Sequence, residues 1–214
     1  MSFRQVDGLD FDSACAMLSS VIAELFNEHL YLLDDERITE YQRKTFRNIA
    51  AGEATQTELK NSLRLLTTLM NLYYDRQVIL SIDEYDVPLD KAFQYGYYDE
   101  MVSLIRSLFG NVLKTNPNLY FAVLTGCLRI SKESIFTGLN NLKVLTLTDV
   151  RFDEYFGFTD SEVDQLYEKY TRNTREIHIS REDLREWYDG YTTKSGERMY
   201  NPRSVVCLLY TSDA

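Results

Sequence analysis

An acidic pair directly after a short apolar run is the stretch of this sequence best suited to chemistry. Val78–Ile82 reads Val-Ile-Leu-Ser-Ile, and Asp83, Glu84 and, one residue later, Asp86 follow it. A short run rich in β-branched residues is typical of a strand buried on both faces of a parallel sheet. Carboxylates at the C-terminal end of such a strand lie where open α/β sheets bind ligands. Asp83 can then hold Mg²⁺ through water, and Glu84 can orient or deprotonate an attacking water. This is the Walker B pattern of nucleotide-hydrolysing P-loop proteins; the alternative is that the acids begin a solvated loop.

A polar residue also ends a second apolar run. Leu119–Thr125 reads Leu-Tyr-Phe-Ala-Val-Leu-Thr, and a glycine follows it. ATPases of the AAA type place a γ-phosphate sensor at the end of the strand beside Walker B, so Thr125 is a candidate sensor. Arg129 and Lys132 come next and could meet phosphate charge. The alternatives are a Thr-Gly turn followed by two solvated loop cations.

The elements before the acidic pair predict a parallel α/β arrangement. Met1–Val6 reads as the end of a strand, and helical spacing of apolar residues follows it. A strand, helices and a second strand, joined by right-handed crossovers, give a parallel sheet. Three helices are predicted here: one over 10–26 with caps in Asp10–Asp12, one over 34–50 with Tyr41, Phe46 and Ile49 as apolar contacts, and one over 55–74 opened by the capping box Thr55–Glu58.

Beyond the acidic pair, Pro88 opposes further strand pairing. We expect Asp90–Tyr98 to form a loop whose aromatic residues pack beneath it or, as the alternative, stack on a base or a partner. A helix is predicted over 98–114, and a short strand over Val144–Leu147.

The composition changes near residue 150. The capping boxes Thr159–Glu162 and Ser180–Asp183 each open a helix, the second containing the only tryptophan, Trp187. We expect a small helical module with its own aromatic core, such as a lid or a winged-helix element. The fold class is therefore α/β, with a core over residues 1–150 and a helical module over 151–206.

The composition argues against several functional classes for this protein. The net charge of −10 argues against a general nucleic-acid coat or a membrane-surface protein, and no segment here marks a recognition helix for DNA. Three cysteines with no Cys-x-x-Cys pair favour a reduced, cytoplasmic setting. The two histidines lie far from any cysteine in sequence, so a zinc site is not indicated.

Taken together, these motifs resemble the predicted AAA-ATPase-like family, whose members typically join a P-loop ATPase domain to a C-terminal restriction-like nuclease domain. The resemblance runs from about residue 52 to residue 204. It is carried by Ile82-Asp-Glu-Tyr-Asp-Val-Pro, Tyr97-Tyr-Asp-Glu-Met, Leu124-Thr-Gly, Arg129-Ile-Ser-Lys-Glu-Ser-Ile-Phe, Gly138-Leu-Asn-Asn-Leu, Tyr155-Phe-Gly-Phe-Thr, Trp187-Tyr-Asp-Gly-Tyr and Tyr200-Asn-Pro.

The resemblance implies roles for four residues. Asp83 would be the carboxylate on the Mg²⁺ side and Glu84 the catalytic one. Thr125 would be the sensor, and Arg129 a cation facing phosphate. ATP and Mg²⁺ are the implied cofactors of the intact parent protein.

The departure from the family is the Walker A loop, roughly G-x-x-x-x-G-K-[ST], which supplies most phosphate contacts. None of the nine glycines here is followed by lysine. We therefore expect an internal fragment of an ATPase-like parent that by itself binds no nucleotide tightly. The last residues, 207–214, look like the translation of a sequencing adapter, with an ordinary terminal helix as the alternative.

Two rival functions stay open at this stage. One is a non-catalytic interaction module that kept the P-loop fold, with a second copy or another protein as its partner. The other is a Mg²⁺-dependent nuclease using Asp83 and Glu84. It fits less well, because restriction-like motifs want an acid-x-Lys where Tyr85 and Asp86 stand. Whether the chain acts as an enzyme is left undecided by its residues alone.

Overall fold

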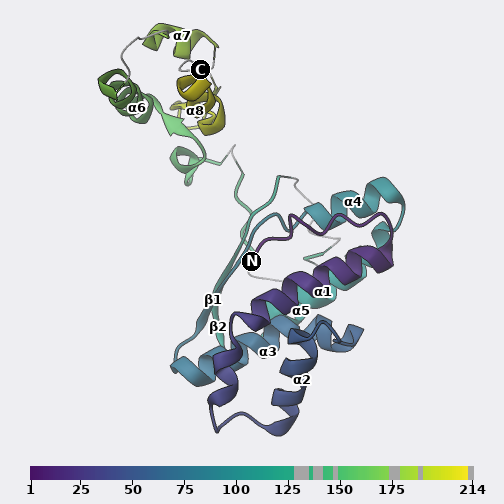
Figure 1. The fold of residues 1–214 in the computed structure, drawn as a ribbon. Helices are drawn as coiled ribbons and strands as arrows, with labels where there is room; N and C mark the ends of the chain where they lie inside the picture. The colour runs from purple at the N-terminus through teal and green to yellow at the C-terminus, as the bar shows by residue number, and fades with distance from the viewer. Residues whose placement is uncertain (128–134, 137–141, 147–148, 174–178, 188–189, 212–214) are drawn as a thin grey trace. The chain divides into compact units, whose positions relative to one another are not determined.

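The computed structural model describes residues 1–127, 135–136, 142–146, 149–173, 179–187 and 190–211 (Figure 1). The chain forms two compact units, residues 1–142 and residues 143–214, and each is described by itself. The first unit contains, in order, α1 (Phe11–Asn27), the 3₁₀ helix η1 (Leu30–Asp34), α2 (Glu40–Ala50), α3 (Gln56–Tyr74), β1 (Val78–Ile82), α4 (Val87–Tyr95), α5 (Tyr98–Leu113) and β2 (Leu119–Leu124).

Local sequence explains where the first helices begin. Asp10 accepts a hydrogen bond from the Ser13 backbone N–H at 2.8 Å and caps α1. Thr55 and Glu58 form the predicted capping box at the start of α3. The predicted helices over 10–26, 55–74 and 98–114 are confirmed as α1, α3 and α5.

The strands β1 and β2 pair in parallel, as predicted. Leu80 lies opposite Ala122, and Ile82 lies opposite Leu124. The chain start pairs briefly beside β1, because Ser2 forms an isolated parallel bridge with Asp83. The small parallel sheet with its helices makes the first unit a mixed α/β structure, which confirms the coarse fold class.

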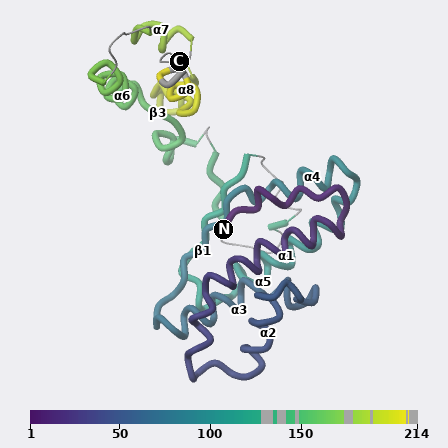
Figure 2. Tube along the Cα trace, viewed as in Figure 1, coloured from purple at the N-terminus to yellow at the C-terminus, as the bar shows by residue number. Residues whose placement is uncertain are grey.

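The helices cover one face of this sheet. Figures 1 and 2 show α1, α3 and α5 running together on one side of β1 and β2. Leu80 and Ile82 point into the core on that side and are buried. The core also holds large side chains from the chain start, from α1, α2, α3 and from α5, among them Phe3, Leu18, Phe26, Phe46, Leu63 and Phe109.

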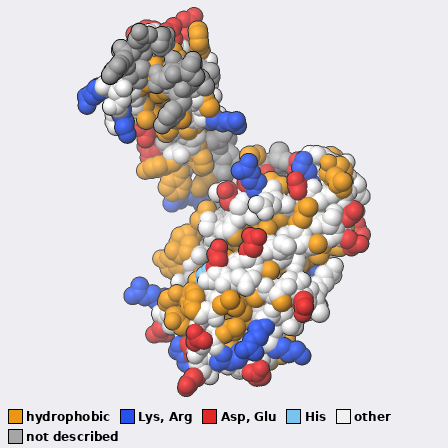
Figure 3. Space-filling view, viewed as in Figure 1, with side chains coloured by type: hydrophobic (Ala, Val, Ile, Leu, Met, Phe, Trp, Pro, Cys, Tyr) orange, Lys and Arg blue, Asp and Glu red, His pale blue; other side chains and the backbone are white. Residues whose placement is uncertain are grey.

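The prediction that β1 is buried on both faces is wrong for the described residues. Ile79 is 57% exposed, and the neighbouring Phe121 and Val123 on β2 are 45% and 44% exposed. No described helix covers this second face, so its apolar side chains meet solvent. Figure 3 shows hydrophobic side chains along the side of the first unit where β1 and β2 lie.

The loop predicted for Asp90–Tyr98 is also wrong, because α4 occupies Val87–Tyr95. Pro88 stands in the first turn of α4, where a missing backbone N–H costs nothing. Gly96 ends the helix with a φ of +86°. Pro88 thus starts a helix rather than merely ending a strand.

Two further boundaries differ from the prediction. The helix expected over 34–50 begins only at Glu40, because Thr39 and Gln42 form a capping box there. Tyr41, expected as an apolar contact, is 77% exposed. Residues 144–146 form no strand, and Leu147, the last residue of the strand predicted there, lies outside the described residues.

The second unit combines helices with a small antiparallel sheet of order β3-β5-β4, whose strands the sequence did not predict. The capping boxes at Thr159–Glu162 and Ser180–Asp183 form as predicted. Trp187 is 64% exposed, so it does not belong to the expected aromatic core. The elements are the 3₁₀ helix η2 (Asp153–Tyr155), β3 (Phe158–Thr159), α6 (Asp160–Asn173), α7 (Arg181–Trp187), β4 (Tyr191–Thr192), β5 (Arg198–Tyr200) and α8 (Pro202–Thr211).

Candidate functional site

The carboxyl ends of β1 and β2 bring three of the four predicted site residues together. Because the strands are parallel, Asp83 and Glu84 leave β1 at the edge where Thr125 leaves β2. Backbone hydrogen bonds continue past the strands: Thr125 N–H donates to the Ile82 carbonyl at 2.9 Å, and Tyr85 N–H donates to the Thr125 carbonyl at 3.1 Å. The acidic pair and the threonine are therefore held in fixed register.

The Thr125 side chain contacts Asp83 directly. Its Oγ1 hydroxyl donates a hydrogen bond to Oδ1 of Asp83. Both residues are exposed to solvent. A carboxylate aimed by a hydroxyl on the neighbouring strand is oriented before any ligand arrives.

Glu84 has an unusual backbone. Its φ is +55°, in the left-handed region that costs a non-glycine residue about 1–3 kcal/mol. The side chain is half-buried, and its Oε2 accepts a hydrogen bond from Ser2 Oγ at 3.0 Å. The two adjacent acids therefore have different partners: Asp83 is hydrogen-bonded to Thr125 and Glu84 to Ser2.

The third acid of the motif, Asp86, is buried at 3% exposure and precedes α4. Gly126, directly after Thr125, makes room for it: a Cβ at position 126 would lie 2.5 Å from Oδ1 of Asp86. A larger residue at position 126 would therefore force the buried Asp86 side chain to shift. The glycine after the sensor candidate thus has a packing reason of its own.

The fourth predicted residue, Arg129, lies outside the described residues, as does Lys132. The structure therefore neither joins them to the acidic pair nor separates them from it. Their proposed role toward phosphate stays a prediction.

A metal at this edge would have few protein ligands. Within the ranges that the structure describes, no group of three or more histidine, cysteine, aspartate or glutamate residues could hold an ion. Mg²⁺ in nucleotide sites keeps several waters and is bound through one or two carboxylates plus phosphate oxygens. Asp83 with the Thr125 hydroxyl beside it fits that kind of site and does not fit an all-protein cage.

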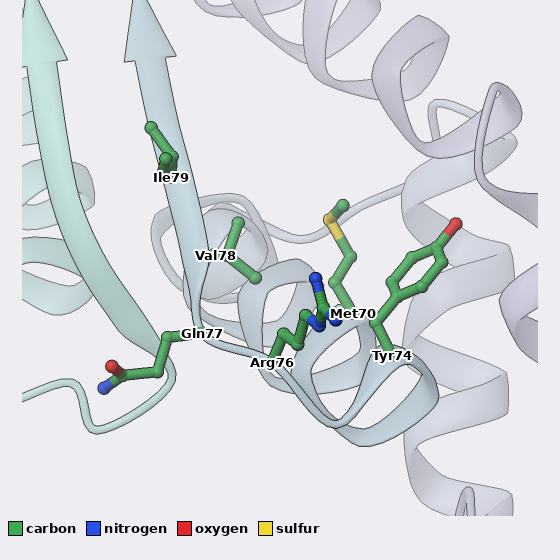
Figure 4. A pocket seen from close by; sticks show the side chains of 6 residues that line it. All are labelled: Met70, Tyr74, Arg76, Gln77, Val78 and Ile79. Carbon is green, nitrogen blue, oxygen red and sulfur yellow. The ribbon is translucent and has the colours of Figure 1, made fainter.

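A surface hollow lies at the opposite end of the strand. It has a volume of about 350 Å³, and Figure 4 shows its lining side chains around the turn between α3 and β1. They are Met70, Tyr74, Arg76, Gln77, Val78 and Ile79. This is the amino end of β1, whereas ligands of parallel sheets bind at the carboxyl ends. The Asp83 edge therefore remains the predicted site of the chemistry.

The contact between Ser2 and Glu84 is not predicted by the sequence. The sequence predicts that Met1–Val6 ends a strand. If that segment pairs in parallel with β1, one of its residues lies next to Asp83. The residue and register could not be read from so short a run.

Comparison with known proteins agrees with the resemblance seen in the sequence. The sequence model of a family described as predicted AAA-ATPase matches residues 5–136, which include Asp83, Glu84 and Thr125. The chain is also similar to a protein of Azotobacter chroococcum mcd 1 described as "Uncharacterized protein in vnfD 5'region". The two are 32% identical over 134 residues, which make up 62% of this chain and 25% of that protein. The chain thus matches about a quarter of the relative's length. No solved structure matches.

Proposed function

The chain belongs to the predicted AAA-ATPase family, and we propose that it supplies the Walker B half of an ATP-binding and ATP-hydrolysing site in a longer protein. The observation that carries this proposal is the meeting of Asp83, Glu84 and Thr125 at the carboxyl ends of two parallel strands. That edge is where α/β sheets bind nucleotides.

The proposed roles are those that the resemblance to the family implies, and the contact between Asp83 and Thr125 supports them. Asp83 holds Mg²⁺ through water, with its carboxylate aimed by Thr125. Glu84 accepts a proton from the attacking water, whose oxygen forms the new bond to the γ-phosphorus while the bond to ADP breaks. Thr125 is the sensor that helps to place this water, and Arg129 faces the phosphates. Bound Mg²⁺ supplies the positive charge that phosphoryl transfer requires.

In this proposal the phosphate-binding half comes from outside these 214 residues. No glycine in the chain is followed by lysine, so no Walker A loop is present in it. We propose that upstream sequence in the longer protein supplies this loop, and that the chain alone binds ATP weakly. In the described residues no helix is long and apolar enough to cross a membrane. A cytoplasmic location belongs to the same proposal.

The rival function is an interaction module that kept the fold without catalysis. The exposed apolar side chains Ile79, Phe121 and Val123 favour this second candidate, because such surfaces commonly bind protein. Retention of Asp83 and Glu84 with an ordered Thr125 contact favours the ATPase.

Recovery of the source locus and expression of its full open reading frame distinguish the two. The ATPase proposal expects a Gly-Lys-Ser/Thr loop upstream and Mg²⁺-dependent release of phosphate from ATP. It also expects that Asp83→Asn weakens the dependence of ATP binding on Mg²⁺, while the exposed acid change Asp99→Asn on α5 does not. Absence of the loop together with absence of ATP binding would leave the interaction module.

A further inference from the structure

The chain start lies beside the acidic pair and contacts both of its members. The Phe3 backbone N–H donates to the Asp83 carbonyl at 2.9 Å, and the Asp83 N–H donates to the Met1 carbonyl at 3.0 Å. These are backbone hydrogen bonds, so they hold residues 1–3 beside Asp83 whatever the side chain at position 2. The Ser2 side chain is thereby presented to the turn after β1.

Ser2 makes the side-chain contact to Glu84. Its Oγ lies 3.0 Å from Oε2 of Glu84 and also accepts a hydrogen bond from the Arg4 backbone N–H at 3.2 Å. An ionised carboxylate only accepts hydrogen bonds, so the hydroxyl must donate to it. The Arg4 N–H uses a lone pair on the Ser2 oxygen and leaves the hydroxyl proton for Glu84.

Glu84 needs such a contact more than Asp83 does. A glutamate has three side-chain torsions, and a half-buried one can sample several rotamers. Its backbone is already committed to φ +55°, which fixes the direction of the Cα–Cβ bond. A hydrogen bond to Oε2 then favours one carboxylate position and leaves Oε1 for another group.

We propose that Ser2 is a positioning residue, whose hydroxyl holds Oε2 of Glu84 so that Oε1 faces the attacking water. This inference rests on the proposed function, since the water belongs to ATP hydrolysis. It does not come from the family match, which begins at residue 5. Ser2 acts through Glu84 and touches no reacting atom.

The 214-residue chain tests the contact without any catalysis. Three-bond couplings report the χ1 rotamers of Glu84 by NMR. One dominant rotamer is expected in wild type and in Ser2→Thr, and averaged rotamers in Ser2→Ala. The matched control is Ser103→Ala, an exposed serine on α5, which should leave the Glu84 couplings unchanged. Equal couplings in wild type and Ser2→Ala would overturn the inference.

The longer protein tests the consequence. A hydrogen bond to a charged group corresponds to about a 10- to 100-fold effect, so Ser2→Ala should lower kcat by that factor with the ATP KM unchanged. Ser2→Thr should keep most of the rate. In a Glu84→Gln background, Ser2→Ala should add nothing further, whereas a merely structural role would add its own loss and move ATP binding.

The two failures are distinguishable. If wild type hydrolyses ATP and Ser2→Ala is equally fast, the positioning role is overturned and the proposed function stands. If wild type does not hydrolyse ATP while the couplings change, the contact is real but the proposed function fails, and the role in catalysis fails with it.

Discussion

Thr125 donates a hydrogen bond from Oγ1 to Oδ1 of Asp83, across 42 positions of sequence. The bond joins the residue directly after β1 to the residue directly after β2. It makes the orientation of the acidic residue depend on the threonine. A hydroxyl at position 125 is therefore a structural part of the Asp83 site as well as a candidate sensor.

Replacement of Thr125 tests whether its hydroxyl group is needed for ATP hydrolysis. Thr125→Val keeps the shape and removes the hydroxyl, so it should lower ATP hydrolysis by the longer protein about 10-fold or more, whereas Thr125→Ser should keep most of the rate. Thr57→Val, at an exposed position of α3, is the control. Full activity of Thr125→Val in steady-state phosphate release would show that the hydroxyl has no role.

Two glycines should respond to alanine in opposite directions. Gly126→Ala puts a Cβ 2.5 Å from Oδ1 of Asp86 and should destabilise the chain by about 1–3 kcal/mol. Gly110→Ala, inside α5 with nothing within 4 Å of the added Cβ, should stabilise it by about 0.4–1 kcal/mol. Urea unfolding of the isolated chain measures both. A destabilised Gly110→Ala or a neutral Gly126→Ala would contradict the packing described for that position.

The exposed sheet face should make the isolated chain self-associate. Phe121→Thr combined with Val123→Thr keeps residues suited to a strand and removes apolar surface, so it should lower the association seen by sedimentation velocity at rising concentration. Tyr41→Thr removes a 77% exposed aromatic residue from α2 and is the control. A wild-type chain that stays monomeric at high concentration would contradict the prediction.

Acid should weaken the second unit through Asp160. Hydrogen bonds from Tyr200 at 2.6 Å and Arg181 at 2.9 Å hold the pKa of the Asp160 carboxyl below its ordinary value. Because the pKa is lower in the folded state, the stabilisation is present above the unfolded pKa of about 3.9 and is lost as pH falls through the folded pKa.

Thermal unfolding followed by Trp187 fluorescence reports on this unit, because Trp187 is the only tryptophan and lies in α7. The Tm difference between wild type and Asp160→Asn should be constant from pH 7 to about 5 and shrink below about pH 4. Glu168→Gln, in an exposed ion pair with Arg172, should change the Tm little at any pH. A wild-type advantage that grows toward low pH would contradict the assignment.

The sequence predicted the parts of this fold that depend on local chemistry. Capping boxes located α3, α6 and α7, and apolar runs located β1 and β2 and hence the meeting of Asp83 with Thr125. These features depend on residues a few positions apart, which is why a single sequence reveals them.

The features that the sequence did not predict depend on contacts between segments far apart in the chain. Pro88 suits both the end of a strand and the first turn of a helix, and only the chain beyond it decides. The exposure of Ile79 depends on which layers cover the sheet, and an apolar run looks the same in either case. The contact between Ser2 and Glu84 depends on how the chain start aligns with β1. Only Ser2 and Asp83 form a bridge there, and a sequence pattern cannot reveal the alignment of so short a pairing.

We propose that Glu84 activates water in an ATP-hydrolysing site of the longer protein. The most direct measurement compares single-turnover phosphate release with ATP binding in the longer protein, for wild type and Glu84→Gln, with the exposed Glu53→Gln as control. We predict that Glu84→Gln binds ATP with unchanged affinity and releases phosphate about 10²–10⁴-fold more slowly. Phosphate release at the wild-type rate in Glu84→Gln would contradict the account.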